Sequence, residues 1–322
     1  MKFEFKISKW ANFYYFLHNF AECEWPWPYR PKGPITVWKK KFGDFSIEEK
    51  SAIDLFKEIY NKHFLKIYIG KLFFESDNPW TELEKQLPNN DTNALKKAFS
   101  VFEEKFDKIF EDNYGFLENW KKELSLKFKN KSLVKEIGGI LSNFFGVDLS
   151  RKEFNIFLLL GSDLDISLDK YISGAGGERG RGLDEGNILL EFNINCPVEK
   201  IDYIQGVIWH EVAHYCIDKS SYNKLASRII KPKKAVNYVS ELIIRSLLPV
   251  GIIGMEFFNA PEPLSLTFKQ ESLPFIETKE TEKIIKLIDS SIKDRKKIDG
   301  IYIEDLIKIL SGIEKWATLL RE

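Results

Sequence analysis

The stretch 207–216, VIWHEVAHYC, constrains the fold more than any other part of the chain. It holds two of the four histidines in 322 residues, His210 and His214, with Glu211 directly after the first. The apolar neighbours indicate a buried helix, which we expect over about 198–218. Buried imidazoles and a buried carboxylate are costly unless they have partners. The chain must therefore fold so that another group satisfies these side chains.

A metal ion is one such partner. Residues four apart lie on one face of a helix, so His210 and His214 can direct two imidazoles at one point. Zn²⁺ accepts nitrogen ligands at about 2.0–2.1 Å in a tetrahedral shell. Glu211 is rotated by about 100° from His210, which places it beside the ion and within reach of a water molecule. The alternative is a structural histidine pair that binds no metal.

The sequence HEVAH resembles the HExxH motif of the zincin metallopeptidases. The resemblance implies that His210 and His214 bind one Zn²⁺ ion and that Glu211 is the general base. It also implies a hydrolase that cleaves peptide bonds, with a peptide or protein as its substrate. No histidine follows His214, which excludes the metzincin pattern HExxHxxGxxH. His18 and His63 stand alone, and we expect both to be ordinary surface or core residues.

A catalytic zinc site usually has three protein ligands, and gluzincins supply a glutamate from a second helix. Glu241 suits this role because it follows His214 by 27 residues, enough for a turn and a returning helix. The alternative is an ion pair between Glu241 and Arg245 at i, i+4. The chain departs here from the best-known gluzincins, which carry an acid four residues after the ligand glutamate.

Other residues compete for places around the metal. Glu256 and Glu262 are rival third ligands. Cys196 would be the ligand in a site like that of peptide deformylases, but NINCPVE does not match their EGCLS-type motif. Asp218, four residues after His214, is either an orienting partner for its second ring nitrogen or a solvated acid at the helix end.

The reaction also needs a hydrogen-bond donor for the oxyanion, and a tyrosine or an arginine must supply it because no histidine is left. Tyr238, one turn before Glu241, is the main candidate, and Tyr222 is another. The alternative is that both are core residues, as buried tyrosines more often are.

Two segments are expected to border the cleft. In zincins, a strand at the sheet edge precedes the active helix and pairs with the substrate, and NILLEFNI at 187–194 occupies that place. The alternative is an internal core strand. The segment 173–186, SGAGGERGRGLDEG, lacks a phosphate-binding motif and is expected to be a mobile loop, with Arg179 and Arg181 contacting substrate or solvated.

The patterning predicts an α+β fold: a mixed sheet with a zincin-like active-site helix, plus a helical C-terminal lobe. Strands are expected at 1–7, 35–39, 64–74, 154–161 and 187–194. Helices are expected at 10–22, 47–63, 90–120, 132–145, 198–218, 234–248, 279–295 and 303–320. The predicted domains are an N-terminal α+β region (1–130), a zincin-like core (131–218) and a helical lobe with the third ligand (219–322).

Composition narrows the classes of function. The net charge is zero, which argues against a nucleic-acid partner. The three cysteines follow no zinc-ribbon or disulfide pattern, and we see neither a signal peptide nor an apolar run long enough to span a membrane. We therefore expect a cytoplasmic zinc metallopeptidase, and, as the alternative, a catalytically weak or inactive zincin scaffold that binds peptides or regulates. Glu211 favours the enzyme, because binding alone needs no base.

Overall fold

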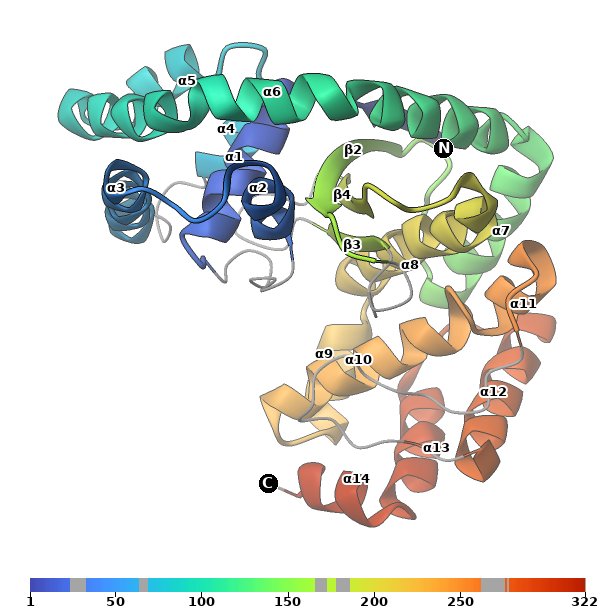
Figure 1. Cartoon of the computed structure of the whole chain (residues 1–322). Coiled ribbons are helices and arrows are strands. Elements are labelled where there is room, and N and C mark those ends of the chain that lie inside the picture. Colours follow the sequence, from blue (N-terminus) through green and yellow to red (C-terminus); the bar gives the residue numbers. More distant parts are fainter. Residues whose placement is uncertain are drawn as a thin grey trace. The chain divides into compact units, whose positions relative to one another are not determined.

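The structure is a computed structural model that describes residues 1–23, 33–63, 69–165, 173–177, 186–261, 276 and 278–321. The described residues form an α+β fold in which helices predominate (Figure 1). The chain divides into two compact units. The sheet unit comprises Phe3–Lys127 and Phe154–Val198, and the helical unit comprises Met1–Lys2, Phe128–Glu153 and Glu199–Glu322. The division into three domains, 1–130, 131–218 and 219–322, stays a prediction.

In the described part of the chain, the sheet unit consists of one strand, six helices and then three more strands. They are β1 (Lys2–Lys6), α1 (Lys9–Phe20), α2 (Pro34–Phe42), α3 (Ile47–His63), α4 (Ile69–Glu75), α5 (Pro79–Gln86), α6 (Asn89–Phe128), β2 (Glu153–Ser162), β3 (Ser173–Gly177) and β4 (Asn187–Asn193). The strands form one sheet in the order β1-β2-β4-β3, in which β4 runs parallel to β2 and antiparallel to β3. The predicted mixed sheet is therefore present.

The strand β4 is internal. It lies between β2 and β3, and every one of its residues is buried. Its run of apolar residues, including Leu189, Leu190 and Phe192, is typical of a strand with neighbours on both sides. The prediction that 187–194 is an edge strand that pairs with substrate is therefore wrong, and the core-strand alternative is correct.

The glycine-rich segment is only partly a loop. Residues Ser173–Gly177 form the strand β3, which pairs with β4 from Ser173 opposite Phe192 to Gly177 opposite Ile188. A ladder needs only backbone groups, so a strand without large side chains can still form next to a well-formed neighbour. The prediction of a loop is wrong for these residues, and Arg179 and Arg181 lie outside the described residues.

Aromatic side chains form much of the core of the sheet unit. Phe13 of α1 stacks on Phe106 of α6 with ring centroids 4.3 Å apart, and meets Phe99 edge-on at 4.8 Å. Asn12 fixes α1 to β2, because its amide donates to the Leu158 carbonyl at 3.0 Å and accepts from the Leu160 N–H at 2.8 Å.

The long helices of this unit were predicted correctly. The helix α3 starts with a capping box: Glu49 accepts from the Ser46 N–H at 2.7 Å, and Ser46 Oγ accepts from the Glu49 N–H at 3.2 Å. The prediction is also confirmed for α1 and α6, and for the strands β1 and β2.

Two short segments were predicted as strands and are helical. The segment 35–39 belongs to α2, which starts at Pro34 and ends before Gly43. Within 64–74, the described part belongs to α4, where Ile69, Gly70, Phe73 and Phe74 are buried. This burial at i, i+1, i+4 and i+5 is helical, but a seven-residue window is too short to reveal it against β-branched and aromatic content.

The helical unit is built around one buried helix. Its elements are α7 (Lys131–Phe145), the 3₁₀ turn η1 (Val198–Lys200, at the unit boundary), α8 (Ile201–Lys219), α9 (Tyr222–Ile229), α10 (Lys233–Leu247), α11 (Ile252–Phe258), α12 (Thr278–Lys293), α13 (Gly300–Ser311) and α14 (Glu314–Leu319). The helix α8 packs against α7, α9, α10 and α11. Trp209 of α8 is buried and stacks on Phe128.

The predicted helices of this unit are present with small differences. The helix α8 begins at Ile201 rather than 198, because the first residues form the 3₁₀ turn. The helices α7, α10 and α12 follow the predicted ranges closely. The segment 303–320 forms two helices, α13 and α14, because the first ends at Gly312.

The stretch Lys233–Phe258, which spans α10 and α11, is the one helical stretch in the described part of the chain that is long and apolar enough to cross a membrane. However, 67% of its most apolar window is buried inside the structure, as is also found for core helices.

Candidate metal centre

Two histidines meet on the buried helix α8. One turn separates His210 from His214, and their ring centroids lie 4.7 Å apart. Their Nε2 atoms are 3.1 Å from each other. Only 13% of the His210 side chain and 8% of the His214 side chain is exposed, so both imidazoles are largely shielded from solvent.

The helix α10 brings Glu241 to the same point. Its Oε2 atom is 3.0 Å from Nε2 of His214, and its Oε1 atom is 3.7 Å from Nε2 of His210. One ligand atom from each of the three residues lies within 4.8 Å of the others. The structure therefore brings the three residues predicted as ligands together, from two helices of one unit.

The spacing of these atoms suits a divalent ion. Ligand atoms about 2.0–2.1 Å from a tetrahedral zinc lie about 3.3–3.4 Å from each other. The 3.1 Å between the two Nε2 atoms and the 3.0 Å from Nε2 of His214 to Oε2 of Glu241 are slightly shorter than this value, and Nε2 of His210 lies 3.7 Å from the other carboxylate oxygen, Oε1. Two imidazoles and a carboxylate also suit other first-row divalent ions, so the donors fit a metal without selecting zinc.

A backbone carbonyl fixes the orientation of His210. Its Nδ1 atom lies 3.0 Å from the carbonyl oxygen of Leu248, directly after α10. A carbonyl only accepts, so Nδ1 carries the proton and Nε2 presents its lone pair to His214 and Glu241. Metal-binding histidines usually have such a partner on the second nitrogen.

Glycine at position 206 allows this carbonyl to come close. Gly206 lies one turn before His210 on α8, and a Cβ atom there would be 2.9 Å from Cβ and 3.2 Å from Cα of Pro249. Real Cβ atoms essentially never approach so closely, so any other residue would displace the turn that carries Leu248.

Glu241 has both of the partners that the sequence offered as alternatives. Arg245 donates from Nε to Oε1 of Glu241 at 2.8 Å. The other oxygen, Oε2, faces His214. The ion pair with Arg245 and the position beside the two imidazoles are thus compatible.

The surroundings hold two of these groups in the states that a metal requires. Burial and the neighbouring His214 lower the pKa of His210 to about 4, although Glu241, Glu211 and the Leu248 carbonyl act in the opposite direction. Burial alone would raise the pKa of Glu241, but the hydrogen bond with His214 and the charges of His210, His214 and Arg245 hold it well below its usual range. At neutral pH, His210 is therefore neutral and Glu241 is ionised, as metal ligands must be.

Glu211 adjoins this group but is not one of the three residues that could hold a metal ion. It is only 7% exposed, and its charge is close enough to raise the pKa of His210. In the described part of the chain its carboxylate has no hydrogen-bond or ion-pair partner. Its oxygens are not among the fully buried polar atoms without a partner in the described residues, and its place beside His210 is consistent with a role toward a bound molecule.

The other candidate residues have contacts of their own. Tyr238 is buried on α10, with Nζ of Lys234 5.5 Å from its ring centroid, and its role stays a prediction. Tyr222 is an unsuitable oxyanion donor, because it is fully buried and its hydroxyl donates to the Val236 carbonyl at 3.2 Å. Asp218 is exposed, in agreement with a solvated acid.

The rival ligands do not join the three residues. Glu256 is exposed on α11, and Glu262 lies outside the described residues. The sulfur of Cys196 contacts the carbonyl of Pro197 at 3.9 Å, and the described metal-binding group contains no cysteine.

Sequence reasoning missed two parts of the site, the Leu248 carbonyl and Gly206. Every residue has a backbone carbonyl, so the sequence does not show which of them will contact a given side chain. The end of α10 before Pro249 was predicted, but not that it would face His210.

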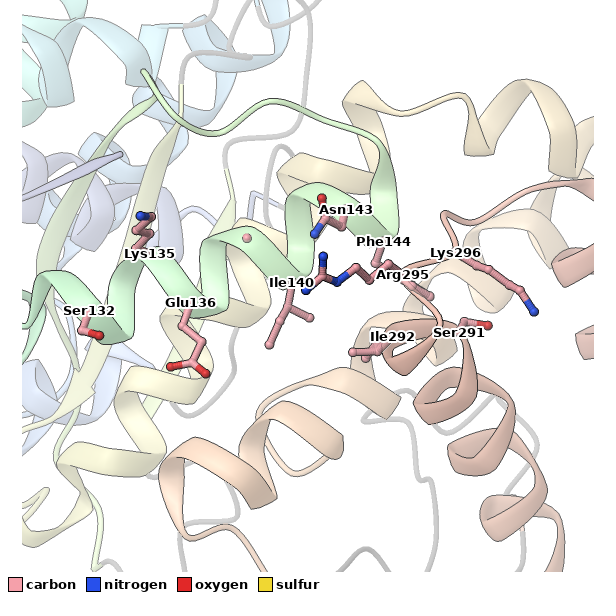
Figure 2. Close-up of a pocket in the computed structure, with 11 residues that line it drawn as sticks. Ser132, Lys135, Glu136, Ile140, Asn143, Phe144, Ser291, Ile292, Arg295 and Lys296 are labelled. Carbon is pink, nitrogen blue, oxygen red and sulfur yellow. The ribbon is translucent and has the colours of Figure 1, made fainter.

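A pocket of about 530 Å³ lies elsewhere in the helical unit, between α7 and α12 (Figure 2). Its charged lining includes Lys135, Glu136, Arg295 and Lys296, and Lys296 also pairs with Asp294 at 2.8 Å. None of the predicted site residues lines this pocket.

No protein-family model, no curated protein and no solved structure matches the chain. The function must therefore be inferred from the residues of the site themselves.

Proposed function

We propose that the protein is a zinc-dependent metallopeptidase in which His210, His214 and Glu241 hold one Zn²⁺ ion. The observation that carries the proposal is the convergence of one atom from each residue within 4.8 Å, with Glu211 directly after the first ligand. Two histidines and one glutamate are a ligand set of catalytic zinc sites and leave a fourth position open. A structural site would close that position with a fourth protein ligand.

The ion, when bound, supplies a lowered pKa for a water molecule and a polarised scissile carbonyl. Glu211 accepts the proton as the water oxygen forms its bond to the carbonyl carbon. The same carboxyl group then delivers the proton to the leaving nitrogen as the C–N bond breaks. The Leu248 carbonyl keeps the lone pair of His210 directed at the site throughout.

Tyr238 is the proposed donor to the oxyanion, because it is one turn before Glu241 on α10. Replacing it with phenylalanine removes only the hydroxyl and tests this role.

The assignment to gluzincin-like zincins belongs to the same proposal. It is supported by two ligands on one helix and a glutamate on a later helix, α10, that packs against it. Two features depart from the pattern: Arg245 replaces the acid expected after the ligand glutamate, and β4 is not an edge strand. A peptide or protein substrate and a cytoplasmic location are part of the proposal.

The test compares Glu211→Gln with the unchanged protein, using a peptide mixture whose cleavage is followed by mass spectrometry. General acid–base catalysis contributes about 100- to 10,000-fold, so we expect at least about 100-fold slower cleavage. Zinc content should stay at one ion per chain, because Glu211 is not a ligand. The control is Glu256→Gln, the same change at an exposed position of α11, which should leave the rate unchanged.

The outcomes separate the enzyme from a binding scaffold. Cleavage that depends on Glu211 and on zinc supports the peptidase. Zinc binding without cleavage of any peptide, with or without Glu211, would favour the inactive scaffold. A protein that binds no zinc would contradict both.

A further inference from the structure

We propose that Arg245 is a positioning residue for the third metal ligand. Its guanidinium holds one oxygen of Glu241 and so fixes the other toward the metal. This inference rests on the proposed function, because it concerns a ligand of the same ion.

The two oxygens of Glu241 have separate partners. Oε1 accepts from Nε of Arg245 at 2.8 Å, and Oε2 lies 3.0 Å from Nε2 of His214. Oε1 is farther, 3.7 Å, from Nε2 of His210. The arginine therefore bonds the oxygen that lies 3.7 Å from His210, and leaves Oε2 directed at His214 at the shorter distance of 3.0 Å.

The contact is more than an ordinary surface pair. Arg245 and Glu241 lie four residues apart on α10, and their side chains are 22% and 24% exposed. Partial burial weakens the screening by water that makes exposed pairs nearly worthless. The Nε–H bond of a planar guanidinium also has a fixed direction, so it restricts the rotation of the carboxylate plane.

Glu241 needs this restriction because its side chain is long. A glutamate loses more rotamer entropy on becoming fixed than most residues, and a metal ion that finds it already fixed does not have to supply that loss. Ligand carboxylates are commonly held by such hydrogen bonds, and removing the partner typically weakens metal binding about 10- to 100-fold.

The positive charge of Arg245 weakens metal binding, because a cation and a divalent metal ion repel each other. Positioning and repulsion therefore predict opposite changes in zinc affinity when Arg245 is removed. If positioning dominates, removing Arg245 weakens zinc binding, and if repulsion dominates, removing it strengthens zinc binding.

The experiment measures the zinc dissociation constant of the full chain by competition with a chromophoric chelator. We expect about 10- to 100-fold weaker binding for Arg245→Gln. The absorption spectrum of the cobalt-substituted protein should also change, because the geometry of the ligand oxygen changes. Arg228→Gln, which removes an exposed arginine from α9, is the matched control and should change neither reading.

A second variant separates geometry from charge. Arg245→Lys keeps the charge but lacks the Nε–H bond of fixed direction, so we expect zinc binding to remain weaker than in the unchanged protein. Circular dichroism and thermal unfolding verify that each variant is folded, and Arg245→Lys carries the test if Arg245→Gln does not fold.

Unchanged or tighter zinc binding in the folded variants overturns the inference and leaves the proposed function intact. Full recovery of binding by lysine also overturns it, because charge alone would then suffice. If the unchanged protein binds no zinc, the inference and the proposed function are both wrong.

Discussion

Among the described residues we compare two places where an imidazole meets a carboxylate, one in each unit. In the sheet unit, Nε2 of His63 lies 2.7 Å from Oδ2 of Asp91, and Lys62 donates to the same carboxylate at 2.9 Å. In the helical unit, Nε2 of His214 lies 3.0 Å from Oε2 of Glu241. By distance and burial of the imidazole the two pairs are nearly alike.

The surroundings of the two pairs differ. His63 ends α3 and Asp91 lies in the first turn of α6, which are favourable positions for a cation and an anion, and hydrogen bonds from Lys62 and His63 lower the pKa of Asp91. In the helical unit, Nε2 of a second imidazole lies 3.1 Å from Nε2 of the first. An ion pair that only stabilises the fold does not require a second imidazole. The proximity of one histidine to one acid therefore does not indicate a metal site, whereas the convergence of three donor atoms does.

The largest expected difference between the two places concerns zinc itself. His214→Ala removes one of the converging nitrogens, so the purified protein should no longer retain a stoichiometric zinc ion. His63→Ala should retain it in full. The measurement is metal content after dialysis, by atomic spectroscopy. Equal retention in both variants would mean that the three residues are not the ligands.

A smaller effect is expected on stability of the metal-free protein as the pH falls. The pKa of His210 is lowered in the folded state from 6.5 to about 4, so the unfolded chain binds more protons in this range. The resulting stability is fully present above about pH 6.5 and is lost as the pH falls toward 4.

We therefore expect the free energy of unfolding to drop by roughly 2–3 kcal/mol more in the unchanged protein than in His210→Gln between pH 7 and 4.5. Urea titrations of the chelated proteins at both pH values measure this difference. Parallel pH profiles of the two proteins would show that His210 is not buried in its neutral form.

The smallest effect is expected at Gly206. In Gly206→Ala the new methyl group meets Pro249, and overpacking of about 1–3 kcal/mol outweighs the helix-propensity gain of about 1 kcal/mol. We expect a net loss of up to about 2 kcal/mol, together with weaker zinc binding, because the Leu248 carbonyl moves away from His210.

The matched control is Gly139→Ala on α7. A Cβ atom there has nothing within 4 Å, so this variant should gain about 0.5–1 kcal/mol. Thermal unfolding of both variants gives the comparison. A Gly206→Ala protein as stable as Gly139→Ala would contradict the close approach at Pro249.

How far the sequence predicted the structure depended on the length of each signal. The helices α3 and α6 were predicted because a capping box or many turns of periodic apolar residues define them. The segments 35–39 and 69–74 were not, because one or two turns of helix and a short strand share the same apolar composition. The place of β4 within the sheet was also missed, since pairing order depends on distant segments.

The candidate site shows the same limit at the level of single groups. The two histidines were predicted from helical spacing, and Glu241 from the resemblance to gluzincins; the structure brings all three together. The orientation of His210 depends on a main-chain oxygen, and that of Glu241 on which of its two oxygens Arg245 takes. The sequence predicts neither orientation, because both depend on how α8 and α10 pack.

The origin of the ligands on α8 and α10 has one more consequence. The intervening chain, 27 residues from His214 to Glu241, becomes a closed loop when one ion joins its ends. Such a closure restricts the unfolded chain as a disulfide does, yet it needs no oxidant and is undone by a chelator. A bound ion would thus also act as a reversible cross-link between α8 and α10.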